Sequence, residues 1–155
     1  MKRLFLLLLP IALILLQACS EDIQSHEEMV RDRIEEGRQF ATERKTDKLV
    51  AMVTDDFLAT RGIDKKNLKI WMARFYLSSK SAKVFVRIKE VRADWQTAEA
   101  TILMGTTNLS LKEMNLDKLR GRLLHMTINF RFIDEVWMIN QVDWRDARPE
   151  DLTIF

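Results

Sequence analysis

The fold depends most on two alternating stretches near the C-terminus, RLLHMTINFRF (122–132) and VWMINQVDWR (136–145). Between them stand Ile133 and the turn-compatible pair Asp134-Glu135. Two alternating runs joined by two turn residues are typical of an antiparallel β-hairpin. Three pairs define the register we expect: Ile133 with Val136, Phe130 with Ile139, and Met126 with Asp143.

The hairpin has one face that suits a core wall and one that is mostly polar. In the unbroken register, the core face carries Leu124, Met126, Ile128, Phe130, Phe132, Trp137 and Ile139, and continues through Gln141, Asp143 and Arg145. The other face carries His125, Thr127, Asn129, Arg131, Met138, Asn140, Val142 and Trp144. Because the far end of the core face turns polar, we expect a pocket there.

Residues 1–18 have the layout of a secretory signal peptide. Lys2 and Arg3 precede an apolar run, Leu4–Leu16, which is shorter than the roughly 20 residues of a membrane-spanning helix. We expect the signal at 1–18, a lipidated cysteine with a short tether at 19–22, and a single domain at 23–155.

The end of this signal, Leu16-Gln17-Ala18-Cys19, resembles the lipobox of bacterial lipoproteins. The resemblance implies cleavage before Cys19, a diacylglycerol on its thiol and a fatty acyl group such as palmitate on its amine. Ser20 stands where the retention signal of the inner membrane has Asp, which implies the outer membrane and a domain in the periplasm. An ordinary signal with a chance cysteine, or an uncleaved anchor, is the alternative.

Composition excludes several classes of protein. Loss of Lys2 and Arg3 leaves 23 basic residues against 23 acidic ones, because the whole chain has 25 and 23. A nearly neutral mature protein argues against a nucleic-acid partner. With one cysteine and two histidines, we expect no intramolecular disulfide, no metal site and no cofactor.

The N-terminal half predicts three helices. Ser25 and Glu28 form a capping box for the first, which we expect to run to about Arg44. Thr46 or Asp47 caps a short second helix, and Asp64 caps the third. Asp55-Asp56-Phe57 is expected to lead from the second helix into a turn at Arg61-Gly62.

A second hairpin is predicted from Ser81 to Met104, with a corner at Ala93-Asp94. Its apolar residues fall on opposite faces before and after the corner, so we expect a bend or β-bulge that brings them together. The stretch 105–121 is either a strand extended by a loop or a short helix acting as a lid. The tail from Arg148 either folds back onto the domain or meets a partner.

The chain contains three local patterns: a short helix with its exit at 47–57, a hairpin corner entering a strand at 92–98, and a hairpin with an aromatic residue after an acidic turn at 132–139. They occur in the order found in the nuclear-transport-factor-2-like cone fold, also called SnoaL-like. The chain resembles that family from about residue 23 to 145. The resemblance implies an α+β domain in which three N-terminal helices pack on a curved antiparallel sheet, preceded here by the signal peptide. A turn without glycine and the long 105–121 stretch depart from the family pattern.

The same resemblance implies a conical pocket between the helices and the sheet. Some members of the family are isomerases, cyclases or dehydratases that use a carboxylate, and many only bind ligands or proteins. Asp143 is the candidate catalytic base; the candidate pocket residues are Trp71, Phe75, Tyr76, Met126, Trp137 and Gln141. The alternatives are that Asp143 is a rim carboxylate paired with Arg145, and that the aromatic residues are ordinary core.

We therefore expect a non-enzymatic, lipid-anchored periplasmic protein whose domain binds a small apolar ligand or an envelope protein. A small-molecule isomerase or hydro-lyase using Asp143, or an assembly module of an envelope complex, is the alternative. A homodimer through the outer face of the sheet would use Met138, Val142 and Trp144 as contacts.

Overall fold

The structure is a computed structural model that describes residues 24–78, 83–107 and 123–152. The predicted signal peptide, Cys19 and the stretch 108–122 lie outside the described residues. Within the described part, no helix is long and apolar enough to cross a membrane. The elements in chain order are α2 (His26–Thr42), α3 (Thr46–Ala51), β1 (Val53–Ala59), η1 (Thr60–Gly62), β2 (Ile63–Asp64), α4 (Lys65–Ser78), β3 (Lys83–Ala93), β4 (Thr97–Thr107), β5 (Leu123–Ile133), β6 (Val136–Asp146) and η3 (Pro149–Leu152).

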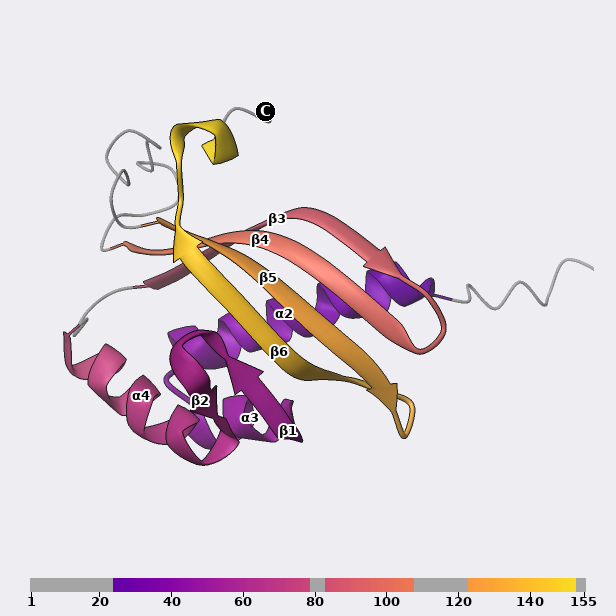
Figure 1. Cartoon of the computed structure of the whole chain (residues 1–155), viewed down its shortest axis with the longest axis horizontal. Coiled ribbons are helices and arrows are strands. Elements are labelled where there is room, and N and C mark those ends of the chain that lie inside the picture. Colours follow the sequence, from indigo (N-terminus) through magenta and orange to yellow (C-terminus); the bar gives the residue numbers. More distant parts are fainter. Residues whose placement is uncertain (1–23, 79–82, 108–122, 153–155) are drawn as a thin grey trace, which may run out of the picture.

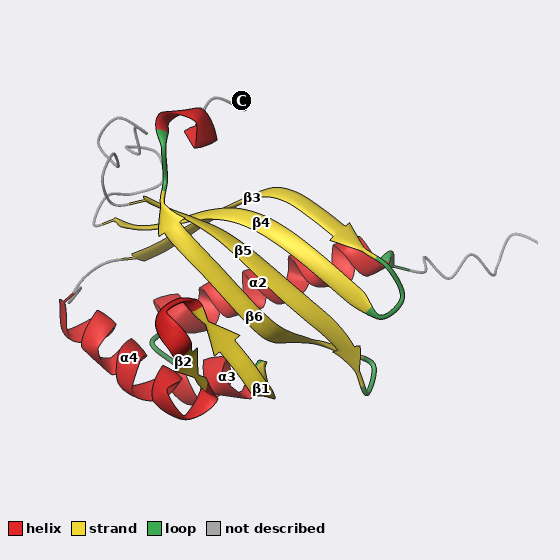
Figure 2. Ribbon diagram, viewed as in Figure 1, coloured by secondary structure: helices red, strands yellow, loops and turns green. Residues whose placement is uncertain are grey.

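The strands form one six-stranded sheet in the order β2-β1-β6-β5-β4-β3. Figure 1 shows the sheet bowed, with α2 lying across one of its faces and α4 near β1 and β2; Figure 2 shows the same layers by type. The predicted α+β class, with three helices packed on a curved sheet, is confirmed. The sheet is antiparallel except where β1 pairs with β6 in parallel.

Strand β1 is the longer of two strands that the sequence did not predict; the other is the two-residue β2. Strand β1 occupies Val53–Ala59, where the sequence favoured the end of the second helix and its exit toward the turn at Arg61-Gly62. Asp55 and Asp56, both exposed, interrupt its apolar alternation, while Phe57 is buried. Its main partner, β6, is distant in the sequence, so no neighbouring pattern signals the pairing.

Two helices begin where their predicted caps stand. The Ser25 hydroxyl accepts from the backbone N–H of Glu28 at 3.2 Å, and the Glu28 carboxylate accepts from the N–H of Ser25 at 2.9 Å. The Asp64 carboxylate accepts from the N–H of Asn67 at 2.8 Å, at the start of α4. These contacts satisfy amide groups that have no partner inside the helix.

The β3–β4 hairpin contains the predicted irregularity. Ile88 pairs with Ile102 and Glu90 with Thr101, so Lys89 is an extra residue in β3. The extra residue reverses the alternation. As a result Val91 joins Ile88 on the same face of the sheet, and both sets of apolar residues reach one core.

The β5–β6 hairpin keeps the predicted register only near its turn. Ile133 pairs with Val136 and Phe130 with Ile139, as expected. Beyond them the register shifts by one, because Asn140 is an extra residue in β6. Met126 therefore pairs with Trp144, and the predicted pairing of Met126 with Asp143 is wrong.

The turn of this hairpin uses two residues with positive φ. Asp134 has φ 49° and Glu135 φ 63°. This is the conformation of the two-residue hairpin turn that usually contains Asn-Gly or Asp-Gly. The twist of the flanking strands thus holds a glutamate where glycine is the easier residue.

The C-terminal segment η3 folds back onto the outer, convex side of the sheet, one of the two outcomes left open for the tail; residues 153–155 lie outside the described residues. The carboxylate of Asp151 is buried. It accepts hydrogen bonds from both terminal guanidinium nitrogens of Arg145, at 2.7 and 2.9 Å, and from the backbone N–H of Arg148 at 2.7 Å. Lys89 donates to the backbone carbonyl of Asp151 at 2.9 Å, and His125 lies 3.6 Å from its carboxylate. We call these five residues the Asp151 clamp.

The clamp depends on charge. Hydrogen bonds from Arg145 hold the pKa of the Asp151 carboxyl well below its usual range, and burial lowers the pKa of His125. A carboxylate with several donors at short distance remains ionised and fixes the tail to strands β3, β5 and β6.

Candidate functional site

A cavity of about 200 Å³ lies between the helices and the concave face of the sheet. Helix α2 contributes Ile34, Gly37 and Ala41, and the sheet contributes apolar side chains from β1, β3, β4, β5 and β6. Those from the sheet are Val53, Phe57, Ala59, Val84, Val86, Ile102, Met104, Leu124, Met126, Ile128, Phe130, Ile139, Val142 and Trp144. The lining is therefore almost entirely apolar.

Gly37 sets the distance between α2 and the end of α3. A Cβ at this position would lie 3.3 Å from the terminal methyl carbon of Met52, closer than most Cβ contacts. The absence of a side chain at Gly37 therefore allows Met52 to approach α2 closely. The side chain of Met52, which is 2% exposed, fills the space beside it and closes this part of the cavity wall.

Four aromatic side chains form one wall of the cavity. Trp71 stacks on Phe75 with ring centroids 5.8 Å apart, and its indole lies 5.4 Å from that of Trp144. Phe75 in turn contacts Tyr76 edge to face at 5.8 Å. Three of these residues come from α4 and one from β6, so this wall joins the helix to the sheet.

The hydroxyl of Tyr76 is the polar atom best placed to meet a ligand. Its oxygen is buried and has no hydrogen-bond partner within the described part of the chain. The ring lies beneath the guanidinium of Arg44, 5.5 Å from its centroid, and burial raises the pKa of the phenol. The group is thus a neutral hydrogen-bond donor in an apolar wall.

Two lining residues are charged, Arg33 and Arg38, and both bind acceptors that do not line the cavity. Arg33 donates from Nε to the carbonyl of Trp137 at 3.0 Å and pairs with Glu36, while Arg38 pairs with Glu35. Among the described lining residues there is no carboxylate, imidazole or thiol. The described residues also contain no group of three or more side chains suited to hold a metal ion. This arrangement can hold an apolar molecule and donate one hydrogen bond to it.

The structure places four of the six predicted pocket residues at the cavity: Trp71, Phe75, Tyr76 and Met126. The other two lie elsewhere. Trp137 is 2% exposed and packs in the core against His26 and Phe132, with centroid distances of 5.7 and 5.0 Å. Gln141 is exposed on the convex face, so its assignment to the pocket is corrected.

Asp143 also lies on the convex face, and its predicted position in the pocket is wrong. The extra residue Asn140 reverses the alternation of β6, so Asp143 is exposed while Val142 and Trp144 turn inward. Its carboxylate accepts from Gln141 at 2.6 Å and from Thr60 at 3.4 Å. The alternative pairing with Arg145 is not found either, because that guanidinium binds Asp151.

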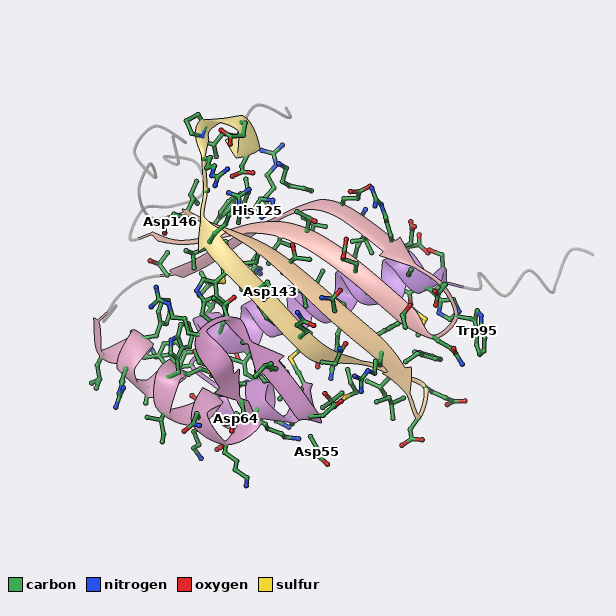
Figure 3. All side chains as sticks on the ribbon, in the orientation of Figure 1. Asp55, Asp64, Trp95, His125, Asp143 and Asp146 are labelled. Atoms are coloured by element: carbon green, nitrogen blue, oxygen red, sulfur yellow. The ribbon has the colours of Figure 1, made fainter. Side chains whose placement is uncertain are left out.

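The same shift corrects two further expectations. Val142 and Trp144 line the cavity, so they are not contacts on an outer dimer surface. Met138 is half-buried, and its sulfur lies 4.0 Å from the Arg33 guanidinium. His125 and Asp143 share the convex face rather than opposite faces, and Figure 3 shows them at different positions along it. His125 belongs to the Asp151 clamp, whereas Asp143 does not.

Sequence reasoning missed the cavity residues from β1 and from the end of β6. Phe57 and Ala59 belong to the strand that stands where the exit from the second helix was expected. Val142 and Trp144 were assigned to the wrong face. One signal in the sequence could have shown this. The unshifted register exposes the large apolar residues Val142 and Trp144 and turns the polar residues Gln141 and Asp143 toward the core, and this unfavourable arrangement indicates a register shift.

Comparison with solved structures finds this fold in several proteins of unknown function. A cystatin-like-fold domain from Nostoc punctiforme is 14% identical, with 83% of this chain and 82% of that chain covered and a TM-score of 0.61. A nuclear-transport-factor-2-like protein from Shewanella oneidensis is 12% identical, with 77% and 98% covered and a TM-score of 0.60. Another from Pseudomonas putida is 15% identical, with 79% and 86% covered and a TM-score of 0.57.

The domain therefore has the nuclear-transport-factor-2-like cone fold, with helices packed on a six-stranded curved sheet. No protein-family model and no curated protein matches the chain. At these identities the likeness shows the fold alone, and fold does not select a chemistry. Function has to be argued from the cavity itself.

Proposed function

We propose that this protein is a lipid-anchored lipoprotein of the cell envelope whose cone domain binds a small apolar ligand carrying one hydrogen-bond acceptor. The cavity carries the proposal. It is lined by apolar side chains, and its one buried donor without a partner in the described part is the hydroxyl of Tyr76. A buried polar group without a partner costs free energy, so a ligand that accepts from it gains affinity.

The size of the cavity limits the ligand. A cavity of about 200 Å³ is somewhat larger than the roughly 150 Å³ cavities that hold benzene. A single aromatic ring with a short substituent, or a short branched chain, is the class of molecule that fits. The aromatic wall of Trp71, Phe75 and Trp144 favours a flat ring that can stack.

An enzyme that uses Asp143 as its base is not favoured by this geometry. The carboxylate is exposed on the side of the sheet opposite the cavity and is held by Gln141 and Thr60. A general base must come within hydrogen-bond reach of the proton that it removes. A molecule in the cavity would be separated from Asp143 by the sheet itself.

Binding can be measured with two probes of similar shape, acetophenone and ethylbenzene, by calorimetry and by intrinsic tryptophan fluorescence, to which Trp71 and Trp144 of the cavity wall contribute. We expect both to bind. Met104→Trp fills the cavity and should abolish binding, while Thr101→Trp, on the opposite face of the same strand, should preserve it. Unchanged binding in the Met104→Trp variant, or no binding to the unmodified protein, would overturn the proposal.

The Tyr76→Phe variant should change the affinity for one probe more than for the other. Acetophenone accepts a hydrogen bond and ethylbenzene does not. Tyr76→Phe should therefore weaken acetophenone by about threefold to tenfold and leave ethylbenzene within about twofold. Equal effects on both probes would show that the hydroxyl does not contact the ligand.

The anchor is tested by the intact mass of the mature protein extracted from membranes. We expect a chain that begins at Cys19 and carries acyl groups, and a Cys19→Ser variant that lacks them and leaves the membrane. A retained Met1, or an unmodified Cys19, would contradict the anchored state.

A further inference from the structure

Three exposed apolar side chains lie at the tips of two neighbouring hairpins. Trp95, in the β3–β4 turn, is 69% exposed, and Figure 3 shows it pointing away from the body of the domain. Ile133 and Val136 pair across the β5–β6 turn and are 41% and 40% exposed. We call these three residues the tip cluster.

Hydrogen bonds hold the turn that carries Trp95. The Asp94 carboxylate accepts from the backbone N–H groups of Gln96 and Thr97, each at 2.7 Å. The N–H of Asp94 donates to the carbonyl of Thr97 at 2.9 Å. These bonds fix the backbone of the turn, and the indole remains exposed although its apolar surface favours burial.

The tip cluster lies at the end of the domain where α2 begins. The ring of His26, the first residue of α2, is 5.4 Å from that of Phe132, whose N–H donates to the carbonyl of Gln96 at 2.8 Å. Gln24 and Val136 line one surface depression. Figure 1 places α4 at the opposite end of the sheet.

The distance to the anchor is short. Five residues separate Cys19 from Gln24, counting Gln24 itself, and a fully extended chain spans at most about 3.3–3.6 Å per residue. If Cys19 is acylated, the start of α2 lies within about 20 Å of the membrane. Among the described residues, the tip cluster is then an exposed apolar surface at the end of the domain that the anchor reaches.

We propose that Trp95, Ile133 and Val136 enter the headgroup layer of the bilayer that holds Cys19, so that the domain stands with this end on the membrane. The inference rests on the proposed lipid anchor. Tryptophan favours this layer because its ring is apolar and its N–H can bond to headgroups or water. A second contact adds to the hold of the acyl chains and fixes the orientation of the domain.

The charges around the cluster select the kind of membrane surface. Glu27, Glu28, Asp94, Asp134 and Glu135 are exposed at the same end, and they outnumber the exposed Arg92 and Arg131, which pair with Glu90 and Asp56. An anionic headgroup would be repelled by these carboxylates. We therefore assign the contact to zwitterionic headgroups such as phosphatidylcholine or phosphatidylethanolamine.

In this orientation the aromatic wall of the cavity is turned away from the membrane. Trp71, Phe75 and Tyr76 lie on α4, at the end opposite the tip cluster.

The experiment uses the full lipidated protein in phosphatidylcholine vesicles that contain bromine-labelled lipid, which quenches nearby tryptophan. The protein has four tryptophans, and the other three, at 71, 137 and 144, are buried or half-buried. We expect quenching in the unmodified protein and its loss in Trp95→Phe. Absence of quenching in the unmodified protein would overturn the inference.

A matched control moves the indole to the other end of the domain. Leu77, on α4, is 71% exposed, close to the 69% of Trp95. The double variant Trp95→Phe/Leu77→Trp should show no quenching. Equal quenching at both positions would mean that the domain has no fixed orientation, and the inference would fail.

Failure of the anchor and failure of the tip contact give different results. Without the anchor, the protein does not float with the vesicles and Cys19 has no acyl mass; both proposals about the membrane then fall. With the anchor but without the contact, the protein floats, carries acyl groups and shows no quenching of Trp95. The second result leaves the proposed function intact and overturns the inference alone.

Discussion

The concave and convex faces of this sheet are built from the same strands, yet they differ in almost every property. The concave face carries Val86, Ile102, Ile128 and Val142 and surrounds a cavity. The convex face carries polar residues, among them Gln141 and Asp143 on β6, and the Asp151 clamp. The contrast teaches that a single extra residue in a strand decides which chemistry reaches the cavity, because side chains alternate with a period of two.

The register of β6 gives the sharpest test, with an all-or-none result. In a Cys19→Ser background, Thr127→Cys/Asp143→Cys should form a disulfide under mild oxidation, since these residues are direct partners. Met126→Cys/Asp143→Cys should not, because Met126 faces the cavity and Asp143 faces away. Intact mass and thiol titration measure both. A bridge in the second variant alone would restore the unshifted register and bring Asp143 back to the pocket.

The two faces should also respond differently to truncation. Phe130 is 1% exposed and lines the cavity, so Phe130→Ala should lower the free energy of unfolding by about 4 kcal/mol. Asn129→Ala, its neighbour on the convex face, should change it by less than about 0.5 kcal/mol. Urea unfolding at pH 7 measures both. Similar losses at the two positions would contradict the division between the faces.

The Asp151 clamp should make the convex face sensitive to acid. Asp151→Asn removes a buried carboxylate bound by Arg145 and should cost about 2 kcal/mol at pH 7. Because the pKa of Asp151 is lowered in the folded state, its contribution is present above its ordinary pKa of 3.8 and is lost as the pH falls below that value. The difference between the two proteins should therefore shrink in acid.

The matched control for the clamp is Asp146→Asn, an exposed carboxylate on the same stretch of chain. It should change the free energy of unfolding by less than about 0.5 kcal/mol at any pH. Urea titrations at pH 7 and below pH 4 compare the three proteins. A difference between the unmodified protein and Asp151→Asn that does not depend on pH would show that packing, rather than charge, holds the tail.

The smallest effect concerns the turn that joins the two halves of the hairpin. Glu135 has φ 63°, where a side chain costs about 1 kcal/mol, so Glu135→Gly should raise the free energy of unfolding by roughly 0.5–1 kcal/mol. Glu135→Ala keeps the Cβ and should give no gain. Thermal unfolding should show a rise of about 3 °C for the glycine variant only. No rise would mean that the turn does not limit the stability of this hairpin.

The parts of the fold that local patterns specify were predictable. The caps at Ser25 and Asp64, the corner at Asp134-Glu135 and the irregularity in β3 all depend on residues within a few positions of one another. Trp71, Phe75, Tyr76 and Met126 could be assigned to the cavity because helical and strand periodicity indicate the inward side. The lipobox and the anchor at Cys19 remain predictions from the sequence.

The sequence by itself determined the α+β class, the starts of α2 and α4, the two hairpins and the aromatic residues that α4 contributes to the cavity, because each follows from local spacing. Only the tertiary structure decided that Asn140 is an extra residue, that Asp143 therefore faces away from the cavity, and that β1 pairs in parallel with β6. The physical reason is that register and pairing depend on the total apolar area buried between segments that are distant in the sequence, such as Val142 and Trp144 against α4 and β1. A local sequence pattern does not contain this information.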